Sequence, residues 1–234
     1  MKFAVRALFS FYLLTCFSGC ETAQQVLGSM NTGSGALSSA EIAAGLKEAL
    51  SIGTQNSTSK LSAVDGFFSN AAIKILLPEE AKNVESTLRN IGLGSLVDKA
   101  VLSINRAAEE ASKSATPIFV NAIKEMTITD ALGILKGGDY AATDYFKSKT
   151  TAPLTAAFKP VIEKALAKTD ATKYWNDVFT AYNKFTTKPI NTDLSGYVTE
   201  KSLSGIFYEV SQEEQKIRKD PAARVTELLK KVFG

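Results

Sequence analysis

The chain has 234 residues, of which 45% are hydrophobic and 22% are charged, and this composition is ordinary for a globular protein. It contains no His and only two Cys, Cys16 and Cys20. The composition therefore excludes His-dependent catalytic triads, His-ligated zinc, and any disulfide bond or thiol nucleophile beyond residue 20.

Residues 1–19 have the pattern of an export signal peptide. Lys2 and Arg6 are followed by an apolar run that is too short to be a stable membrane span. Without these residues the 27 basic side chains become 25, against 24 acidic ones, so the mature chain has a net charge near +1. A nearly neutral chain without a basic cluster predicts that nucleic acid is not a partner.

The signal peptide ends in a segment, Phe17-Ser18-Gly19-Cys20, that resembles a bacterial lipobox, although Phe17 stands where Leu is usual. The resemblance implies cleavage before Cys20 and attachment of acyl chains such as palmitate, which would anchor the protein in a membrane. The alternative is an ordinary secretory signal with an incidental Cys. Glu21 follows Cys20 and favours the outer membrane, with the protein facing the periplasm.

Residues 20–37 are rich in Gly, Ser and Gln, which is typical of a flexible tether. A tether of this length would hold the following domain about 20–25 Å from the lipid. Residues 38–234 are predicted to form one all-α, bundle-like domain of about eight to ten helices. Little or no sheet is expected, because no series of alternating apolar and polar runs is present.

The first predicted helix begins at Ser38, which forms a capping box with Glu41. An apolar face follows and is expected to stop near Gly53. The polar residues 54–62 are either a loop or a weak continuation of this helix.

Residues 64–68 combine turn chemistry with aromatic side chains that are expected to pack inward. Residues 73–77 form a short apolar run that is expected to be extended, because Pro78 disfavours helical geometry in the residue before it. A second helix is predicted to begin with Pro78 in its first turn and to end at Gly92.

The central predicted helix runs from Ser95, its expected N-cap, to Met126. Apolar residues recur along it at helical spacing, including Leu96, and Pro117 is expected to break or kink it.

The remaining helices are predicted from caps and breakers. Thr127 or Thr129 caps a helix over residues 130–136, Asp139 caps one over 140–149, and a helix with a kink at Pro160 follows over 151–168. Asp170 caps a helix through Tyr182, and Thr199 caps a helix that ends at Lys219. Asp220-Pro221 begins the last helix, in which Val225 faces inward.

Several fragments of the chain resemble one known family. They include Asn105-Arg106-Ala107-Ala108-Glu109, Gly138-Asp139, Ala141-Ala142-Thr143-Asp144-Tyr145-Phe146, Tyr174-Trp175, Gly205-Ile206-Phe207 and Asp220-Pro221. Over roughly residues 38–234 the chain is similar to the uncharacterised bacterial family called domain of unknown function 4197. The resemblance implies an exported or lipid-anchored helical protein of Gram-negative bacteria, and it implies no particular activity.

The best candidates for a specific role are the residues set into the central helix, Asn105, Arg106, Glu109 and Glu110. Glu109 and Glu110 follow Arg106 at helical spacing, so a local ion pair is available. One interpretation is an arginine presented to an anionic ligand. The favoured interpretation is a solvated or structural ion pair.

A second set of candidates consists of carboxylates: Glu109, Asp144, Asp193, Glu213 and Glu214. Paired carboxylates can act as general acid and base or bind metal through oxygen. No known metal-binding spacing is present, so neither a metal nor a cofactor is expected. We favour capping roles and ion pairs with Arg106, Arg218 and Arg224.

Aromatic residues with polar groups form the third set of candidates. A sugar- or lipid-binding cleft uses such residues, although at helical spacing they more often belong to a core. The full set of candidate ligand-binding residues is Asn105, Arg106, Glu109, Asp144, Tyr145, Trp175, Tyr182, Asn183, Asp193, Tyr197, Glu213, Glu214, Arg218 and Arg224.

Three functions remain open on this basis. The favoured one is a non-catalytic periplasmic module that binds an envelope protein or a small molecule. The alternatives are a hydrolase of envelope material that uses carboxylates such as Glu109 and Glu213, and a carrier with an internal apolar cavity of about 300 Å³ or more. Convergence of Arg106, Glu109, Asp144 and Arg218 in an open cleft would favour an enzyme, and a closed network would not.

Overall fold

The computed structural model describes residues 37–169, 172, 175, 176, 179, 180, 183, 184, 187, 189 and 192–234. Within these residues the prediction of an all-α fold is confirmed, with eight α-helices, two short 3-10 helices and no strand. The helices are α2 (Ser39–Ser62), η1 (Glu79–Ala81), α3 (Lys82–Asn90), α4 (Gly94–Ser112), α5 (Ala115–Glu125), α6 (Ile128–Lys136), α7 (Ala141–Leu166), α9 (Leu194–Lys219), η2 (Pro221–Ala223) and α10 (Glu227–Phe233).

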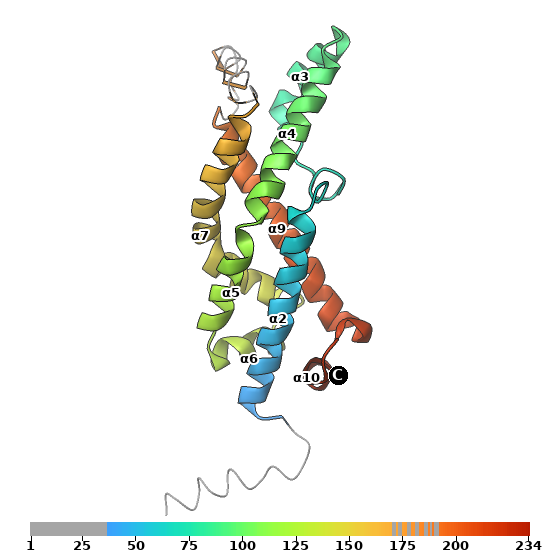
Figure 1. The fold of residues 1–234 in the computed structure, drawn as a ribbon, viewed down its shortest axis with the longest axis vertical. Helices are drawn as coiled ribbons and strands as arrows, with labels where there is room; N and C mark the ends of the chain where they lie inside the picture. Colours follow the sequence, from blue (N-terminus) through green and yellow to red (C-terminus); the bar gives the residue numbers. More distant parts are fainter. Residues whose placement is uncertain are drawn as a thin grey trace, which may run out of the picture. The chain divides into compact units, whose positions relative to one another are not determined.

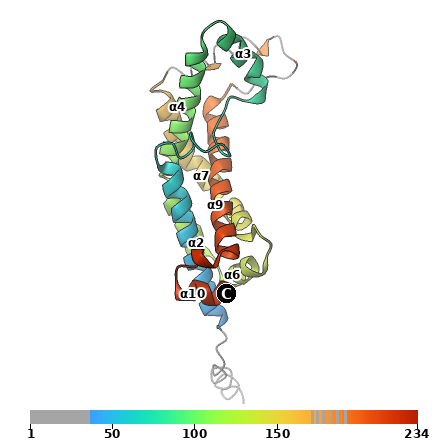
Figure 2. The same ribbon diagram turned by 90° about the vertical axis from the view of Figure 1, so that its right-hand side faces the viewer.

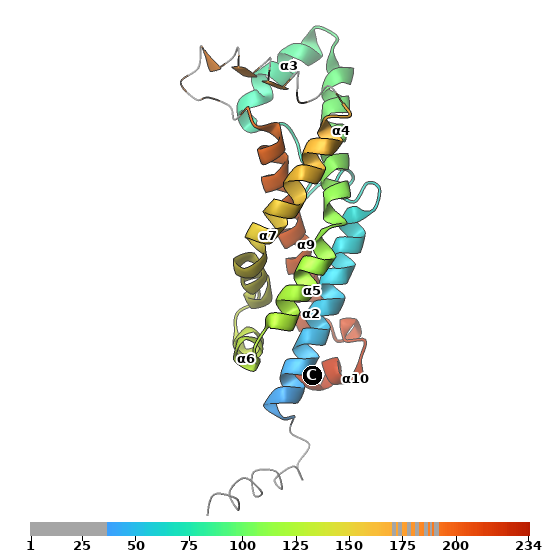
Figure 3. The same cartoon turned by 60° about the vertical axis from the view of Figure 1, so that its left-hand side comes forward.

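The long helices α2, α7 and α9 pack around a common core with α4 and α5 (Figure 1). Helix α5 continues beyond the end of α4 and lies between α7 and α2 (Figure 3). The core is centred on fully buried aromatic side chains, including Phe67, Phe119, Phe146 and Phe158. Phe119 makes edge-to-face contacts with Phe146 and with Phe207, at ring-centroid distances of 5.2 and 6.4 Å.

Helix α2 is longer than the predicted stop near Gly53, so the polar residues 54–62 continue the helix. The Thr54 hydroxyl donates to the Leu50 carbonyl at 2.8 Å, and the Ser57 hydroxyl donates to the Gly53 carbonyl at 2.8 Å. Both side chains are buried, because helix carbonyls satisfy their hydroxyl groups. The polar residues of this stretch therefore belong to a helix face with small side chains whose hydroxyl groups bond to the helix's own carbonyls, and not to a loop.

The connection between α2 and α3 follows the prediction in part. Phe67 is fully buried, but the run predicted as extended from residue 73 begins in a turn, since the N–H groups of Ile73 and Lys74 donate to the Asn70 carbonyl. The run continues to Pro78, which serves as the N-cap of η1 and not as its first residue. Helix α3 ends at Asn90, and Gly92, the residue after the C-cap Ile91, has a φ of +85°. The Gly92 N–H donates to the Arg89 carbonyl and the Leu93 N–H to the Leu88 carbonyl, which is the Schellman arrangement that the glycine predicts.

The predicted central helix is two helices, α4 and α5. Ser95 lies inside α4, whose N-cap is Leu93, and the side chain of Leu96 is exposed instead of packed. The break at residues 113–114 lies four residues before Pro117, because a proline ring clashes with the carbonyl of residue i−4.

Thr127, and not Thr129, caps α6 in a capping box with Asp130. Asp139 does not cap α7, whose N-cap position is Tyr140 and has no side-chain cap of its own. The predicted helices 140–149 and 151–168 are one helix that contains Pro153 and Pro160. Both prolines are exposed, so water can reach the carbonyls that they leave unbonded, and the buried face remains continuous.

The predicted start of α9 at Thr199 is wrong. Asp193 is the N-cap and accepts the Gly196 N–H at 2.9 Å, whereas the buried Thr199 hydroxyl donates to the Ser195 carbonyl. Asp220 caps only η2, Thr226 caps the separate helix α10, and Val225 is exposed instead of inward.

Helix α10 packs on the first turns of α2 (Figure 2). The helix predicted from Asp170 to Tyr182 falls largely outside the described residues, so its prediction stands untested.

Gly205 provides a test of this packing, because α9 touches the 63–78 connection there. A Cβ on Gly205 would lie 2.5 Å from Cε1 of the fully buried Phe67 ring. We expect Gly205→Ala to lower stability by about 1–2 kcal/mol, since overpacking outweighs the gain in helix propensity. Thermal and denaturant unfolding measure the change.

The matched control is Gly133→Ala in α6, where an added Cβ meets nothing within 4 Å. This variant should be neutral or more stable by up to about 1 kcal/mol. A Gly205→Ala protein that is as stable as Gly133→Ala would contradict the close approach of α9 to Phe67.

Candidate functional site

Glu109 of α4 is buried, and both of its carboxylate oxygens are occupied. Oε1 accepts the backbone N–H groups of Phe67 and Phe68, each at 3.2 Å. Oε2 accepts from Arg106 at 2.6 Å, and the other terminal nitrogen of Arg106 donates to Asp65 at 2.7 Å. Asp65 has a positive φ of 67°, so these contacts hold the turn after α2 in an uncommon conformation.

Asn105, the neighbour of Arg106, fixes the extended run in the same way. Its Oδ1 accepts the Ile75 N–H at 2.9 Å, and its Nδ2 donates to the Ile75 carbonyl at 2.7 Å. The amide thereby makes the pair of bonds that one residue of an adjacent strand would make. Asn105 is fully buried, so it substitutes for a missing strand partner.

Glu209 of α9 is a third buried anchor of this connection. It accepts from Asn70 Nδ2 and from Lys60 Nζ, each at 2.8 Å, and the residue is only 2% exposed. The sequence pattern did not single out Glu209, because nothing local distinguishes it from the other acidic residues of α9.

Glu214 supplies the cap that α7 lacks. Its two oxygens accept the N–H groups of Ala142 and Thr143 at 3.0 and 2.9 Å, and the Thr143 hydroxyl at 2.8 Å. Arg218 pairs with Glu214 at 2.9 Å and donates to the Ile134 carbonyl near the end of α6. A negative charge at a helix N-terminus is also favoured by the helix dipole.

The four residues whose convergence in an open cleft would favour an enzyme, Arg106, Glu109, Asp144 and Arg218, do not come together. Arg106 with Glu109 and Arg218 with Glu214 are separate groups that share no hydrogen-bond partner among the described residues. The side chain of Asp144 is 72% exposed and lies 3.7 Å from Lys147. Two of the ionic pairs, Arg106 with Glu109 and Arg218 with Glu214, therefore belong to separate hydrogen-bonded groups, and Asp144 lies apart from both at the surface.

The other predicted residues are dispersed. Tyr145 donates to the Ala122 carbonyl, and Asp193 caps α9 and contacts Lys159. Glu213 pairs with Lys216 and accepts from Asn56, and Arg224 donates to the carbonyls of Ile217 and Arg218. Asn183 also has an interaction partner, and Tyr182 lies outside the described residues.

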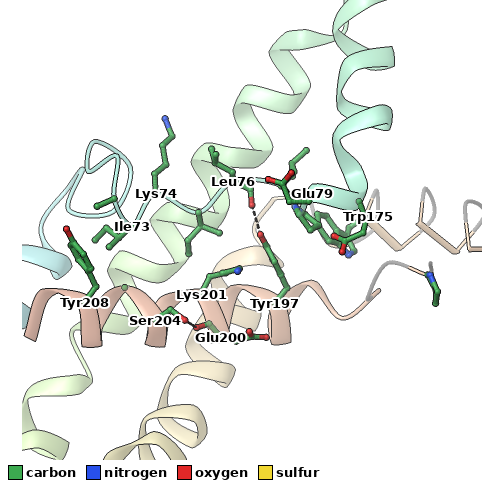
Figure 4. A pocket seen from close by; sticks show the side chains of 17 residues that line it. Ile73, Lys74, Leu76, Glu79, Trp175, Tyr197, Glu200, Lys201, Ser204 and Tyr208 are labelled. Carbon is green, nitrogen blue, oxygen red and sulfur yellow. Dashed lines mark hydrogen bonds between the residues drawn. The ribbon is translucent and has the colours of Figure 1, made fainter. Parts of the chain in front are cut away.

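Two predicted aromatics, Trp175 and Tyr197, line a groove between residues 72–80 and one face of α9 (Figure 4). The groove has a volume of about 800 Å³. Its α9 wall consists of residues at helical spacing, namely Tyr197, Glu200, Lys201, Ser204, Gly205 and Tyr208. Trp175 stacks on Tyr197 with a ring-centroid distance of 6.0 Å and an interplanar angle of 24°.

Tyr197 joins the two walls of the groove by donating its hydroxyl to the Leu76 carbonyl at 2.8 Å (Figure 4). Burial, together with the nearby carboxylates of Glu80, Glu200 and Glu79, raises the pKa of Tyr197 to about 12. At neutral pH the phenol is therefore protonated and remains a donor. The Lys201 ammonium lies 5.7 Å from the centroid of the Tyr197 ring.

Sequence reasoning missed the other wall of this groove. The run of residues 73–77 was recognisable as extended, yet its position beside α9 depends on Asn105 and Tyr197, which lie far from it in the sequence. Glu79, Glu80 and Glu200 were likewise not singled out, because exposed acids near helix starts are common.

Two further properties concern the described residues only. None of their helices is long and apolar enough to cross a membrane. No group of three or more acidic residues among them is arranged to hold a metal ion.

The fold and the groove define an all-α protein whose buried carboxylates organise the backbone and whose open groove is lined by aromatic and charged side chains. The model of the family described as protein of unknown function (DUF4197) matches residues 36–234, and the chain belongs to this family. No curated protein and no solved structure matches the chain.

The role assigned to Glu214 can be tested by substitution. Glu214→Gln removes the charge that pairs with Arg218 and weakens acceptance from the α7 N-terminus. Because a half-removed buried ion pair leaves an uncompensated charge, we expect a loss of about 3 kcal/mol in unfolding free energy. Urea unfolding monitored by circular dichroism measures it.

The matched control is Asp144→Asn, the same chemical change on the exposed first turn of α7. It should change stability by less than about 0.5 kcal/mol, as expected for a surface pair. Equal effects of the two substitutions would contradict the capping role of Glu214.

Proposed function

We propose that the protein is a lipid-anchored, non-catalytic binding module of the cell envelope, and that the groove between residues 72–80 and α9 is its binding site. One observation carries the proposal: the buried carboxylates already accept backbone and arginine hydrogen bonds, while the groove presents aromatic and charged groups at the surface. A binding site needs such accessible, concave and chemically mixed surface.

The anchor rests on the sequence. Cys20 is the last residue of a lipobox-like segment, and two or more acyl chains give stable membrane attachment where a single chain does not. The outer membrane and a periplasmic orientation are part of the same proposal, on the basis of Glu21. Cys20 and Glu21 lie outside the described residues.

The alternative of a hydrolase receives less support from the geometry. A general acid or base must reach the reacting atom, yet Glu109 is 3% exposed and both its oxygens accept hydrogen bonds. Glu213, the second carboxylate considered, pairs with Lys216 and accepts from Asn56.

The alternative of a hydrophobic carrier also fits less well. The groove is large enough for a lipid chain, but its walls include Glu79, Glu80, Glu200 and Lys201. An apolar ligand would desolvate these groups without giving them partners, which is unfavourable.

Substitution of the proposed lipidation site tests the anchor. In the host cell, the wild-type protein should remain in the membrane fraction until detergent is added and should have the mass of an acylated chain. Cys20→Ser should abolish the acyl mass and release the chain from the membrane. Mass spectrometry of both fractions provides the measurement, and membrane retention of Cys20→Ser would contradict the proposal.

Native mass spectrometry of the protein purified from its host tests the binding role. A bound molecule should be present in wild type and in Asp144→Asn, and it should be lost in Tyr208→Ala, which alters one end of the groove. Catalytic turnover that is abolished by Glu109→Gln and kept by Tyr208→Ala would contradict a non-catalytic role.

A further inference from the structure

The extended run beside the groove has two edges, and the edge that faces the groove is only partly paired. Along an extended chain the N–H and C=O groups of successive residues point to opposite sides. Both groups of Ile75 face α4 and are bonded by Asn105. The groups of Leu76 therefore face the other way, and its carbonyl indeed accepts from Tyr197 on α9.

The groove-side edge has free hydrogen-bonding capacity. The Leu76 N–H has no acceptor among the described groups, and its carbonyl, which accepts one hydrogen bond, has room for a second. The Leu76 side chain is 58% exposed. The Lys74 N–H donates to the Asn70 carbonyl and Pro78 has no N–H, so Leu76 supplies the free donor of this edge. An extended residue with a free N–H and a partly used carbonyl can pair with another extended chain.

The charges around this edge are unbalanced. Glu79 pairs with Lys82 at 2.5 Å, whereas Glu80 and Glu200 make no ion pair within the described part of the chain. Lys74 lies over the Phe68 ring at 3.8 Å and points away from α9 (Figure 4). Lys74 and Lys201 are the two cations among the described residues that line the groove, and Lys201 lies on the α9 wall. The carboxylates of Glu79, Glu80 and Glu200 all lie near Tyr197.

We propose that the groove binds an extended segment of a partner protein, which pairs with the backbone of Leu76 and places a basic side chain near Glu79, Glu80 and Glu200. This inference rests on the proposed binding function and names the class of ligand. The pairing would supply affinity through the backbone, and the carboxylates would supply selectivity for charge.

The dimensions of the groove agree with such a ligand. From Tyr197 to Tyr208 the α9 wall rises about 16 Å, at 1.5 Å per residue. An extended chain covers that length with about five residues. The groove therefore fits a short linear segment.

The test uses the full-length protein and a defined probe. The probe is a decapeptide of alternating Lys and Thr, blocked at both ends, and two matched peptides replace Lys by Glu or carry N-methyl groups on alternate residues. Trp175 is the only Trp of the chain and lines the groove, so its fluorescence reports occupancy. Saturable binding of the Lys peptide is expected, with at least tenfold weaker binding of both matched peptides.

Two variants test the backbone edge directly. Leu76→Pro removes the groove-side N–H and should weaken binding of the Lys peptide at least tenfold, because proline cannot donate. Leu76→Ala keeps the N–H and should bind within twofold of wild type. Glu80→Gln combined with Glu200→Gln should weaken binding at least threefold at low salt.

Each outcome decides the inference. Equal binding of the N-methylated and unmodified Lys peptides to wild type would overturn it without relying on any variant, because attraction would then be purely electrostatic. The absence of a saturable Trp175 signal would overturn it as well. If native mass spectrometry still shows a molecule that Tyr208→Ala loses, the binding function stands and only the peptide class is wrong.

Discussion

The structure depends on the need to satisfy backbone groups that no helix satisfies. The chain has no disulfide-forming Cys beyond residue 20, and the described residues contain no sheet, so the 63–78 connection must be held by side chains. Glu109 and Asn105 on α4 bond its backbone groups, and Glu209 on α9 bonds the side chain of Asn70. An unpaired buried N–H would cost about 1–3 kcal/mol, so these contacts stabilise the fold more than an exposed ion pair would.

This constraint explains which parts of the fold could be predicted from sequence. Some signals that act within one turn were confirmed: the capping box at Ser38, a cap at Thr127, which was one of two candidates, and Gly92 just after α3. Ser95 and Thr199 have the same local appearance as Thr127, yet they lie inside helices. Whether a Ser or Thr caps a helix depends on where the chain can be buried, and local spacing does not contain that information.

In the candidate site, too, contacts within one helix could be predicted from the sequence, and contacts between distant residues could not. The pairing of Arg106 with Glu109 follows from their spacing on one helix, and the structure adds the two backbone N–H groups that make Glu109 an internal anchor. The cap that Glu214 provides for α7 joins residues 71 and 72 positions apart. No pattern within a single helix predicts such a contact, and Asp139, the local candidate, instead pairs with Lys219.

The same contacts that complete the fold also prepare the groove. Asn105 occupies one edge of the extended run, which leaves the opposite edge directed at α9, and Tyr197 sets the spacing between the two walls. Because Glu109 and Glu209 hold the residues just before this run, and Asn105 and Tyr197 hold the run itself, little ordering should accompany binding. A rigid edge loses less conformational entropy on association than a loop that must first become extended. The buried ionic residues would then contribute to binding indirectly, by fixing the backbone that a ligand contacts.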